Sequence, residues 1–154
     1  MDIKIICFGK MDANGYSLLE KNYLEKLKRF CRVDVVALKE ETTPDLKKNQ
    51  QKNEQGLERY WQEIPGVKIL LDIAGVQYSS EAFADKIASF NVTANATITF
   101  FIGPSDGFSS EFRARFADKI SFGKATLPHQ LARIVMLEQI YRAFKIINHE
   151  KYHK

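Results

Sequence analysis

Three glycine-containing loops follow apolar runs in this 154-residue chain and carry polar side chains. They read LLDIAGVQYSS (70–80), FIGPSDGFSSEF (101–112) and ISFGKATLPHQ (120–130). Glycine lets backbone amides and carbonyls approach a flat ring closely. None of the loops has the GxGxxG or GxxxxGK[ST] spacing, so neither a dinucleotide fingerprint nor a P-loop is predicted. The residues alone predict a small-molecule site, with ordinary turn glycines as the alternative for each loop.

Histidine and tyrosine near the carboxyl terminus are further side chains that could do chemistry. The terminal YHK (152–154) combines a ring, an imidazole and a cation, the types that contact unstacked RNA bases. A frayed terminus is the alternative. His129 stands near the start of a long helix, where a packing role is more usual than catalysis. No metal-ligand spacing and no local Ser/His/Asp motif is recognisable.

Positive charge is concentrated in the last part of the chain. From Arg113 to Lys154 there are nine Lys or Arg and three acidic residues, a balance of +6, whereas the whole chain carries +4. The first 112 residues therefore carry −2. Such a field suits a polyanion such as nucleic acid, and a merely basic surface is the alternative.

The cysteines and the apolar runs indicate a cytoplasmic protein. Cys7 and Cys31 lie in apolar surroundings without CxxC spacing, so they are expected to be reduced thiols. The amino terminus does not resemble a signal peptide. No stretch approaches the roughly 18 apolar residues of a membrane span.

Strand-like and helix-like segments alternate along the chain. Strands are expected at 3–9, 33–39, 67–73, 96–103 and, more weakly, 119–122, and helices at 15–31, 44–63, 79–90, 109–117 and 127–147. This alternation predicts one α/β domain over residues 1–154, with a mostly parallel sheet flanked by helices. Ligands of such sheets bind outside the carboxyl ends of the strands, where the three loops lie.

Two segments leave alternatives open. The helix at 127–147, with Thr126 as the expected N-cap, is apolar on more sides than one core needs. A second copy of the chain is the simplest partner for it, and a helix buried within its own chain is the alternative. The polar stretch 39–55 is interpreted as a mobile loop that leads into a helix, with a functional lid as the alternative.

The order of the sequence blocks resembles a known family, the ribosomal RNA large subunit methyltransferase H family of the SPOUT superfamily. The resemblance is carried by IKIICFGK, LLDIAGVQYSSEAFA, FFIGPSDGF, ISFGKATLPHQLARIVMLEQIYRAFKI and the terminal YHK, and covers essentially the whole chain. It implies a homodimeric SPOUT-type α/β fold with a deep C-terminal trefoil knot, an exception to the rule that chains do not thread.

The resemblance also implies an activity: methyl transfer from S-adenosylmethionine to N3 of a pseudouridine in a 23S rRNA stem-loop of the assembled ribosome. The implied cofactor positions are Leu71, Gly103, Ile120, Ser121, Phe122, Gly123, Lys124, Ala125 and Leu127. The implied RNA-binding positions are Arg133, Arg142, Tyr152, His153 and Lys154. His153 is the expected catalytic residue, which accepts or relays the N3 proton or orients the base. The tail of one subunit is expected beside the cofactor of the other.

Two positions depart from the family pattern. Pro104 stands where a second glycine is usual, which fixes φ and removes a backbone N–H. Gly123 stands where serine is common, so a hydroxyl is absent. Neither change removes a reacting group, and methyl transfer stays the expected function. The alternatives are a ribosome-binding protein of this fold without turnover, and a SPOUT methyltransferase with another RNA target.

Overall fold

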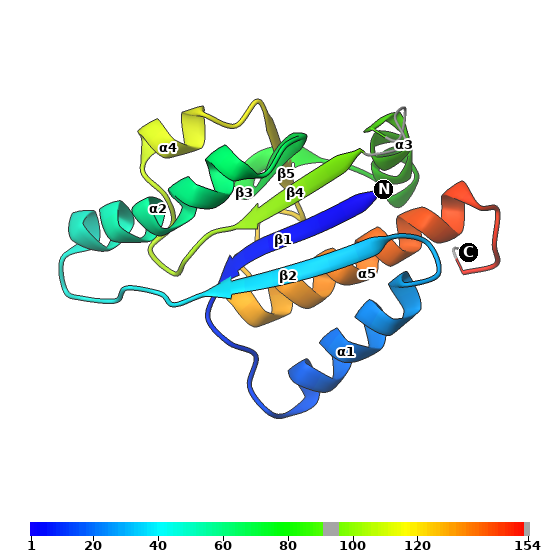
Figure 1. Ribbon diagram of the computed structural model, residues 1–154, viewed down its shortest axis with the longest axis horizontal. Helices are drawn as coiled ribbons and strands as arrows, with labels where there is room; N and C mark the ends of the chain where they lie inside the picture. Colours follow the sequence, from blue (N-terminus) through cyan, green and yellow to red (C-terminus); the bar gives the residue numbers. More distant parts are fainter. Residues whose placement is uncertain (91–95, 153–154) are drawn as a thin grey trace.

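The structure is a computed structural model that describes residues 1–90 and 96–152. Strands and helices alternate along these residues (Figure 1). The strands are β1 (Asp2–Phe8), β2 (Arg32–Leu38), β3 (Val67–Gln77), β4 (Thr97–Ile102) and β5 (Asp118–Ser121). The helices are α1 (Gly15–Leu27), α2 (Leu46–Glu63), α3 (Ser80–Phe90), α4 (Ser110–Ala114) and α5 (His129–Ile147). Each predicted element is found, and the α/β prediction is confirmed.

The strands form one parallel sheet in the order β2-β1-β4-β3-β5. β4 lies inside the sheet, and its apolar run is buried on both faces, as an unbroken run of apolar residues requires. Leu71 of β3 stands opposite Ile102 of β4 and Ile120 of β5. The loops that follow these three strands therefore leave the sheet at the same edge.

Helices cover both faces of the sheet. α1, α3 and α5 cover one face, where they share a core with Ile3 and Ile5 of β1. α2 and α4 cover the other face, where they pack on Ile6 and Phe8 of the same strand (Figure 1). Within the described residues, none of the helices combines the length and apolar content of a membrane-crossing segment.

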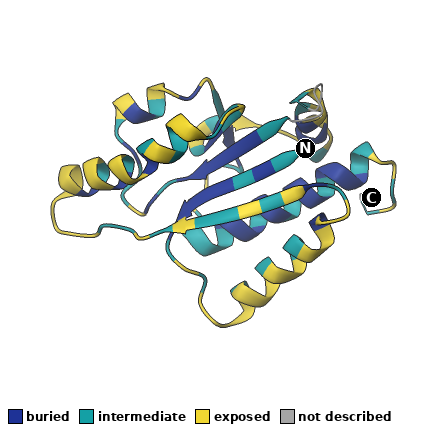
Figure 2. Ribbon diagram, viewed as in Figure 1, coloured by how far each residue is buried: buried dark blue, intermediate teal, exposed yellow. Residues whose placement is uncertain are grey.

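The helix α5 is covered by its own chain. Every residue of α5 is buried or partly buried, whereas α1 and α2 carry many exposed residues (Figure 2). α1 and α3 pack along it, and the ring of Phe30, just after α1, stacks on Phe144 at 5.7 Å between ring centres. Much of the apolar surface of α5 is therefore buried within its own chain, while Leu131, Val135, Ile146 and Ile147 are partly buried; a second copy as partner stays a prediction.

The start of α5 differs from the prediction. Pro128 occupies the N-cap position in an extended conformation (φ −54°, ψ 142°), and no side chain caps the helix. A residue before proline disfavours the helical conformation, which keeps Leu127 outside the helix. The predicted start at 127 and the predicted N-cap, Thr126, are therefore wrong.

The polar stretch 39–55 is largely ordered by α2. Asn53, 2% exposed, pairs with both backbone groups of Glu41, at 2.8 and 3.2 Å. Asn49 pairs in the same way with Thr43, at 2.9 and 2.7 Å. Buried amides satisfied in this way fix the segment that precedes the helix. The stretch leads into a helix as predicted, since α2 begins at Leu46, and the segment before it is held by these hydrogen bonds.

Candidate functional site

A cavity of about 760 Å³ opens at the carboxyl ends of β3, β4 and β5. Its volume falls within the range of about 300–1,000 Å³ that is typical of small-molecule sites. All three glycine-containing loops contribute to its walls, and so do the first turn of α5 and a side chain of α4. The structure thus brings together, at the expected edge of the sheet, segments that are far apart in the sequence.

Seven of the nine predicted cofactor residues line this cavity: Leu71, Gly103, Ser121, Phe122, Gly123, Ala125 and Leu127. The other two lie elsewhere. The side chain of Ile120 is 2% exposed, within the core under α1, α3 and α5. Lys124 is exposed at the surface. Contact of these residues with a cofactor stays a prediction.

The β3 and β5 walls of the cavity are held together by a close backbone approach. β3 runs beyond its predicted end and pairs with β5 a second time at Val76, after an irregular segment. Gly75 allows this, because a Cβ there would lie 2.6 Å from the carbonyl carbon of Ile120. The hydroxyl of Ser121 lies 3.2 Å from the carbonyl oxygen of Ile73. From the sequence alone, this irregular segment could not be distinguished from a loop, because it is short and apolar.

The glycine at position 123 has a conformational reason. Its φ is +132°, a region that L-amino acids with side chains rarely adopt. The Gly123 N–H donates to the hydroxyl oxygen of Ser121 at 3.1 Å, which closes the turn that enters the cavity. A serine at 123 would be strained in this backbone, so the departure from the family pattern goes together with the conformation of this loop.

Pro104, the other departure, lies buried in the cavity wall within a hydrogen-bonded turn. Its carbonyl accepts a hydrogen bond from the Gly107 N–H at 2.9 Å, and Gly107 has φ +66°. The carboxylate of Asp106 accepts a hydrogen bond from the buried amide of Asn49 on α2, at 2.8 Å. The loop is therefore fixed by its own turn and by α2, although position 104 has no N–H to offer.

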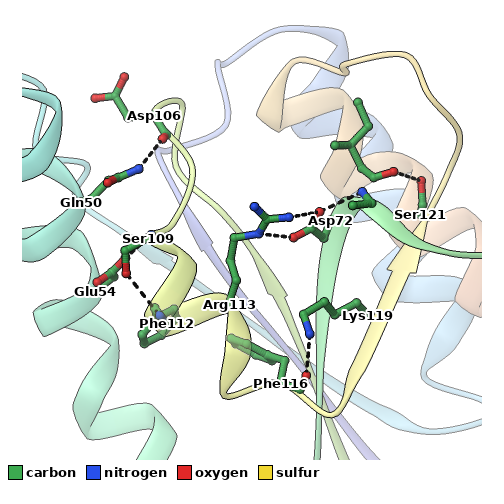
Figure 3. A network of polar contacts seen from close by, with 12 residues as sticks. Gln50, Glu54, Asp72, Asp106, Ser109, Phe112, Arg113, Phe116, Lys119 and Ser121 are labelled. Carbon is green, nitrogen blue, oxygen red and sulfur yellow. Dashed lines mark hydrogen bonds and ion pairs between the residues drawn. The ribbon is translucent and has the colours of Figure 1, made fainter.

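An ion pair that the sequence reasoning missed forms part of the cavity wall. Arg113 of α4 donates two hydrogen bonds to Asp72 on β3, Nε to Oδ2 at 2.6 Å and Nη2 to Oδ1 at 3.0 Å (Figure 3). Asp72 also accepts a hydrogen bond from the Ala74 N–H at 2.9 Å. Burial alone would raise the pKa of Asp72, but the hydrogen bonds from Arg113 and Ala74 outweigh it and lower the pKa. The sequence signal that could have indicated this ion pair was an acidic residue, Asp72, at the end of the predicted strand.

Arg133, predicted to contact RNA, lies inside the subunit. It is 3% exposed, its Nε lies 3.2 Å from Glu20 Oε1 on α1, and its Nη1 lies 3.1 Å from Cys7 Sγ. Burial raises the pKa of Glu20, and the charge of Arg133 opposes that shift. A guanidinium held in this way does not reach a phosphate at the surface. The structure contradicts the prediction for Arg133 and gives it a packing role between α5 and α1.

Arg142 and Tyr152 belong to a cluster near the carboxyl end of α5. The Arg142 guanidinium donates to Glu138 Oε1, at 3.0 Å from Nε and 2.6 Å from Nη2. It also lies 4.8 Å from the centre of the Tyr152 ring. That ring packs edge-on against Tyr141 at 5.0 Å, and its hydroxyl donates to Glu138 at 3.2 Å. The chain is packed as far as Tyr152, which contradicts the alternative of a frayed terminus up to that residue.

A turn at the end of α5 directs the tail back along the helix. His149 has φ 53°, and its N–H donates to the carbonyl of Ile146 at 2.9 Å. The Glu150 N–H donates to the carbonyl of Lys145 at 2.8 Å, which completes a Schellman motif. The Glu150 carboxylate also pairs with Arg29 at 2.9 Å. Two predicted site residues lie outside the described part of the chain: His153 and Lys154.

The cavity and this cluster lie toward opposite ends of α5. His129 lines the cavity, and Arg142 follows 13 residues later. At a rise of 1.5 Å per residue, about 20 Å of helix separate the two positions. Within one chain, Tyr152 packs beside Glu138 and Arg142 and does not line the cavity.

Comparisons with known proteins agree with this architecture. Residues 1–153 match the family described as "Predicted SPOUT methyltransferase". Relatives named ribosomal RNA large subunit methyltransferase H, from Mycoplasma mycoides subsp. mycoides SC and Clostridium beijerinckii, are 43% and 40% identical, with 100% of both chains covered. Among solved structures, a probable methylase family protein from Haemophilus influenzae has a TM-score of 0.53 at 10% identity. The similarity covers 96% of this chain and 66% of that one, just under two thirds of its length, and shows a shared fold.

Proposed function

Because the chain belongs to the ribosomal RNA large subunit methyltransferase H family of SPOUT methyltransferases, we propose that it methylates large-subunit ribosomal RNA with S-adenosylmethionine. The observation that carries this proposal is the convergence of three loops on one cavity, with seven residues that match the family's cofactor positions. A ribosomal substrate implies that the protein acts in the cytoplasm.

The cavity lining suits this cofactor in shape and in charge. Leu71 and Leu127 supply apolar surface for a flat ring, and the glycine loops supply accessible backbone polar groups. The lining includes two carboxylates, of Asp72 and Asp106, and one guanidinium, of Arg113. These three side chains carry a net charge of −1, which complements the net positive charge of S-adenosylmethionine.

When bound, S-adenosylmethionine supplies an electrophilic methyl group on a sulfonium and leaves as a thioether. The residues of the chain have to align the acceptor atom with that methyl group, and alignment of this kind contributes about 7–11 kcal/mol to catalysis. The proposed acceptor is N3 of a pseudouridine in a 23S rRNA stem-loop of the assembled ribosome, as the family resemblance implies. N3 must lose its proton, and His153 is the proposed acceptor or relay.

The proposed site is completed by a second copy of the chain. Tyr152 packs beside Glu138 and Arg142, outside the cavity lining of its own subunit, so we propose that its tail serves the cavity of a neighbouring subunit. Exposed apolar side chains available to such a partner include Leu18 and Leu19 on α1, and Ile73 and Val76 near the end of β3. The start of α1 lies beside the start of α5, because the Asp12 N–H donates to Gln130 at 2.9 Å. The trefoil knot implied by the resemblance also stays a prediction.

Methyl incorporation into intact ribosomes, measured beside stripped ribosomal RNA, tests the function. Transfer to ribosomes that lack the modification, with N3-methylpseudouridine found by nucleoside mass spectrometry, is the expected result. Calorimetric titration is expected to show S-adenosylmethionine binding in the micromolar range, about −8 kcal/mol. Ribosome binding without cofactor binding would favour a non-catalytic role, and a product in another RNA would favour a different target.

A further inference from the structure

Arg113 is the unusual charged group of the cavity. Among the described residues that line it, Arg113 carries the one lysine or arginine charge. Its side chain is 39% exposed, so it reaches the open space of the cavity as well as the Asp72 carboxylate, which is 7% exposed. A cation in a cavity that otherwise carries carboxylates calls for a specific role, because S-adenosylmethionine is itself positively charged.

The position of Arg113 is fixed from two sides. α4 is anchored on the sheet by Phe112, within the helix, and by Phe116, two residues after its end; they are 4% and 2% exposed. From this anchored helix, Arg113 points toward Asp72 of β3, where the pairing of β3 with β5 is interrupted (Figure 3). A guanidinium held by a two-point ion pair loses little further freedom when it binds a ligand.

The ion pair leaves part of the guanidinium available. Nε and Nη2 donate to Asp72, and Nη1 makes no hydrogen bond with the described residues. A guanidinium has five N–H donors in a fixed plane, and carboxylates match that geometry. The methionine part of the cofactor carries one carboxylate, the anionic group on an otherwise cationic molecule.

We propose that Arg113, oriented by Asp72, binds the carboxylate of the methionine part of S-adenosylmethionine. The inference rests on the proposed function and adds a named contact to it. Asp72 follows Leu71 directly, so the same strand end would contribute an apolar surface and, through Asp72, a fixed cation. An RNA phosphate is a less suitable partner, because the ion pair ties the guanidinium back into the wall of the cavity.

Calorimetry with two probes that differ in the amino-acid part tests this contact. S-adenosylhomocysteine carries the carboxylate, and 5′-methylthioadenosine lacks the whole amino-acid part. In Arg113→Gln, the dissociation constant for S-adenosylhomocysteine is expected to rise about 10- to 100-fold, the usual effect of losing a hydrogen bond to a charged group. The constant for 5′-methylthioadenosine is expected to change by less than about 2-fold, since the rest of the site is intact.

Arg115 offers a matched control on the same helix. It donates two hydrogen bonds to Glu58 of α2, from Nη1 at 2.8 Å and from Nη2 at 3.0 Å, and it lies outside the cavity lining. Arg115→Gln is expected to leave both dissociation constants unchanged. Because Arg113→Gln leaves the Asp72 carboxylate buried without its partner, a second variant, Arg113→Gln combined with Asp72→Asn, removes both charges. This double variant is expected to show the same selective loss for S-adenosylhomocysteine.

The results that would overturn the inference are distinct. An equal loss for both probes in a folded Arg113→Gln protein would mean that Arg113 only shapes the cavity. An unchanged affinity for both probes, with weaker ribosome binding, would assign Arg113 to RNA. If the unmodified protein bound neither probe, the proposed function would fail together with this contact.

Discussion

The two ends of α5 are surrounded by different kinds of residues. At its amino end, the helix meets glycine loops, exposed backbone and apolar walls around a cavity, and Pro128 begins it without a side-chain cap. Toward its carboxyl end, the helix carries Glu138, Arg142 and a packed Tyr152, a cluster of charged and aromatic side chains. The proposed function assigns the first end to the cofactor and the second to RNA, so one helix would carry both.

The largest effect is expected when the cavity is impaired in one subunit and the tail is impaired in the other. Gly123→Val places a side chain at a φ of +132° in the cavity wall, and is expected to lower methyl transfer at least about 100-fold through loss of cofactor binding. Tyr152→Ala is expected to lower it about 10- to 100-fold. When the two variants are co-expressed, roughly a quarter of the active sites should recover activity. Half of the dimers would be mixed, and each mixed dimer would hold one intact cavity beside one intact tail.

Methyl incorporation by the purified, differently tagged mixed dimer measures this recovery and should reach about half that of the unmodified dimer, since one of its two sites is intact. Each variant co-expressed with itself is the control and stays inactive. A mixed dimer no more active than its parents would show that a tail serves its own cavity, and the comparison of the two ends would lose its meaning.

A large loss of stability is expected from Arg133→Ala. The change leaves Glu20, whose side chain is 18% exposed, without its ion-pair partner. Breaking a buried pair from one side typically costs about 3–5 kcal/mol of unfolding free energy. Urea denaturation measures the loss, and Glu20→Gln combined with Arg133→Met should recover much of it. A loss below about 1 kcal/mol would contradict the packing role of Arg133 and would make it a candidate for RNA contact again.

Arg142→Ala is the counterpart on the same helix. Its pairing with Glu138 is partly exposed, so unfolding free energy should change by no more than about 1 kcal/mol. Ribosome binding should weaken about tenfold, whereas the calorimetric dissociation constant for S-adenosylmethionine should stay the same. Equal losses in the two titrations would contradict the division of labour between the ends of α5.

A smaller, pH-dependent effect is expected at the cavity end from Asp72→Asn. The folded pKa of Asp72 lies below its ordinary value of 3.8, so the ionised carboxylate stabilises the fold above that value, and the stabilisation is lost as pH falls through the folded pKa. The variant should be less stable by about 1–3 kcal/mol at neutral pH. Urea unfolding at decreasing pH should show this difference shrink. A difference independent of pH would mean that the charge of Asp72 does not matter.

The smallest effect is expected at the turn that follows α5. His149 has φ 53°, a conformation that glycine adopts with less strain. His149→Gly should therefore raise the unfolding free energy by about 0.5–1 kcal/mol. Thermal unfolding monitored by circular dichroism measures the gain, with His149→Ala as the control that gains nothing. A loss of stability in the glycine variant would indicate that the His149 side chain itself holds the tail.

The sequence predicted the features that depend on local order. Alternation of apolar runs located every strand and helix, and the rule for strand ends of parallel sheets identified the three loops around the cavity. These two inferences use residues within short segments. The individual cofactor positions in the loops, such as Gly103 and Gly123, came from the family resemblance.

The features that were missed depend on pairing across the fold. Arg113 and Asp72 are 41 residues apart, and neither segment indicates that the other lies beside it. Arg133 was read as a surface cation because a helix pattern does not show that Glu20 lies opposite it. The N-cap at Thr126 failed for a local reason, since the effect of Pro128 on Leu127 was underestimated.

The close backbone approach at Gly75 limits which substitutions this protein can accumulate. Even alanine would bring its methyl group within 2.6 Å of a backbone atom of the neighbouring strand, so accommodation would require that strand, and the helix that follows it, to shift. Variation in a mutational library should therefore be nearly absent at this one position, while the flanking exposed Ile73 and Val76 accept many residues. Because Gly75 has no side chain, β3 and β5, which are far apart in the sequence, can pack at this short distance.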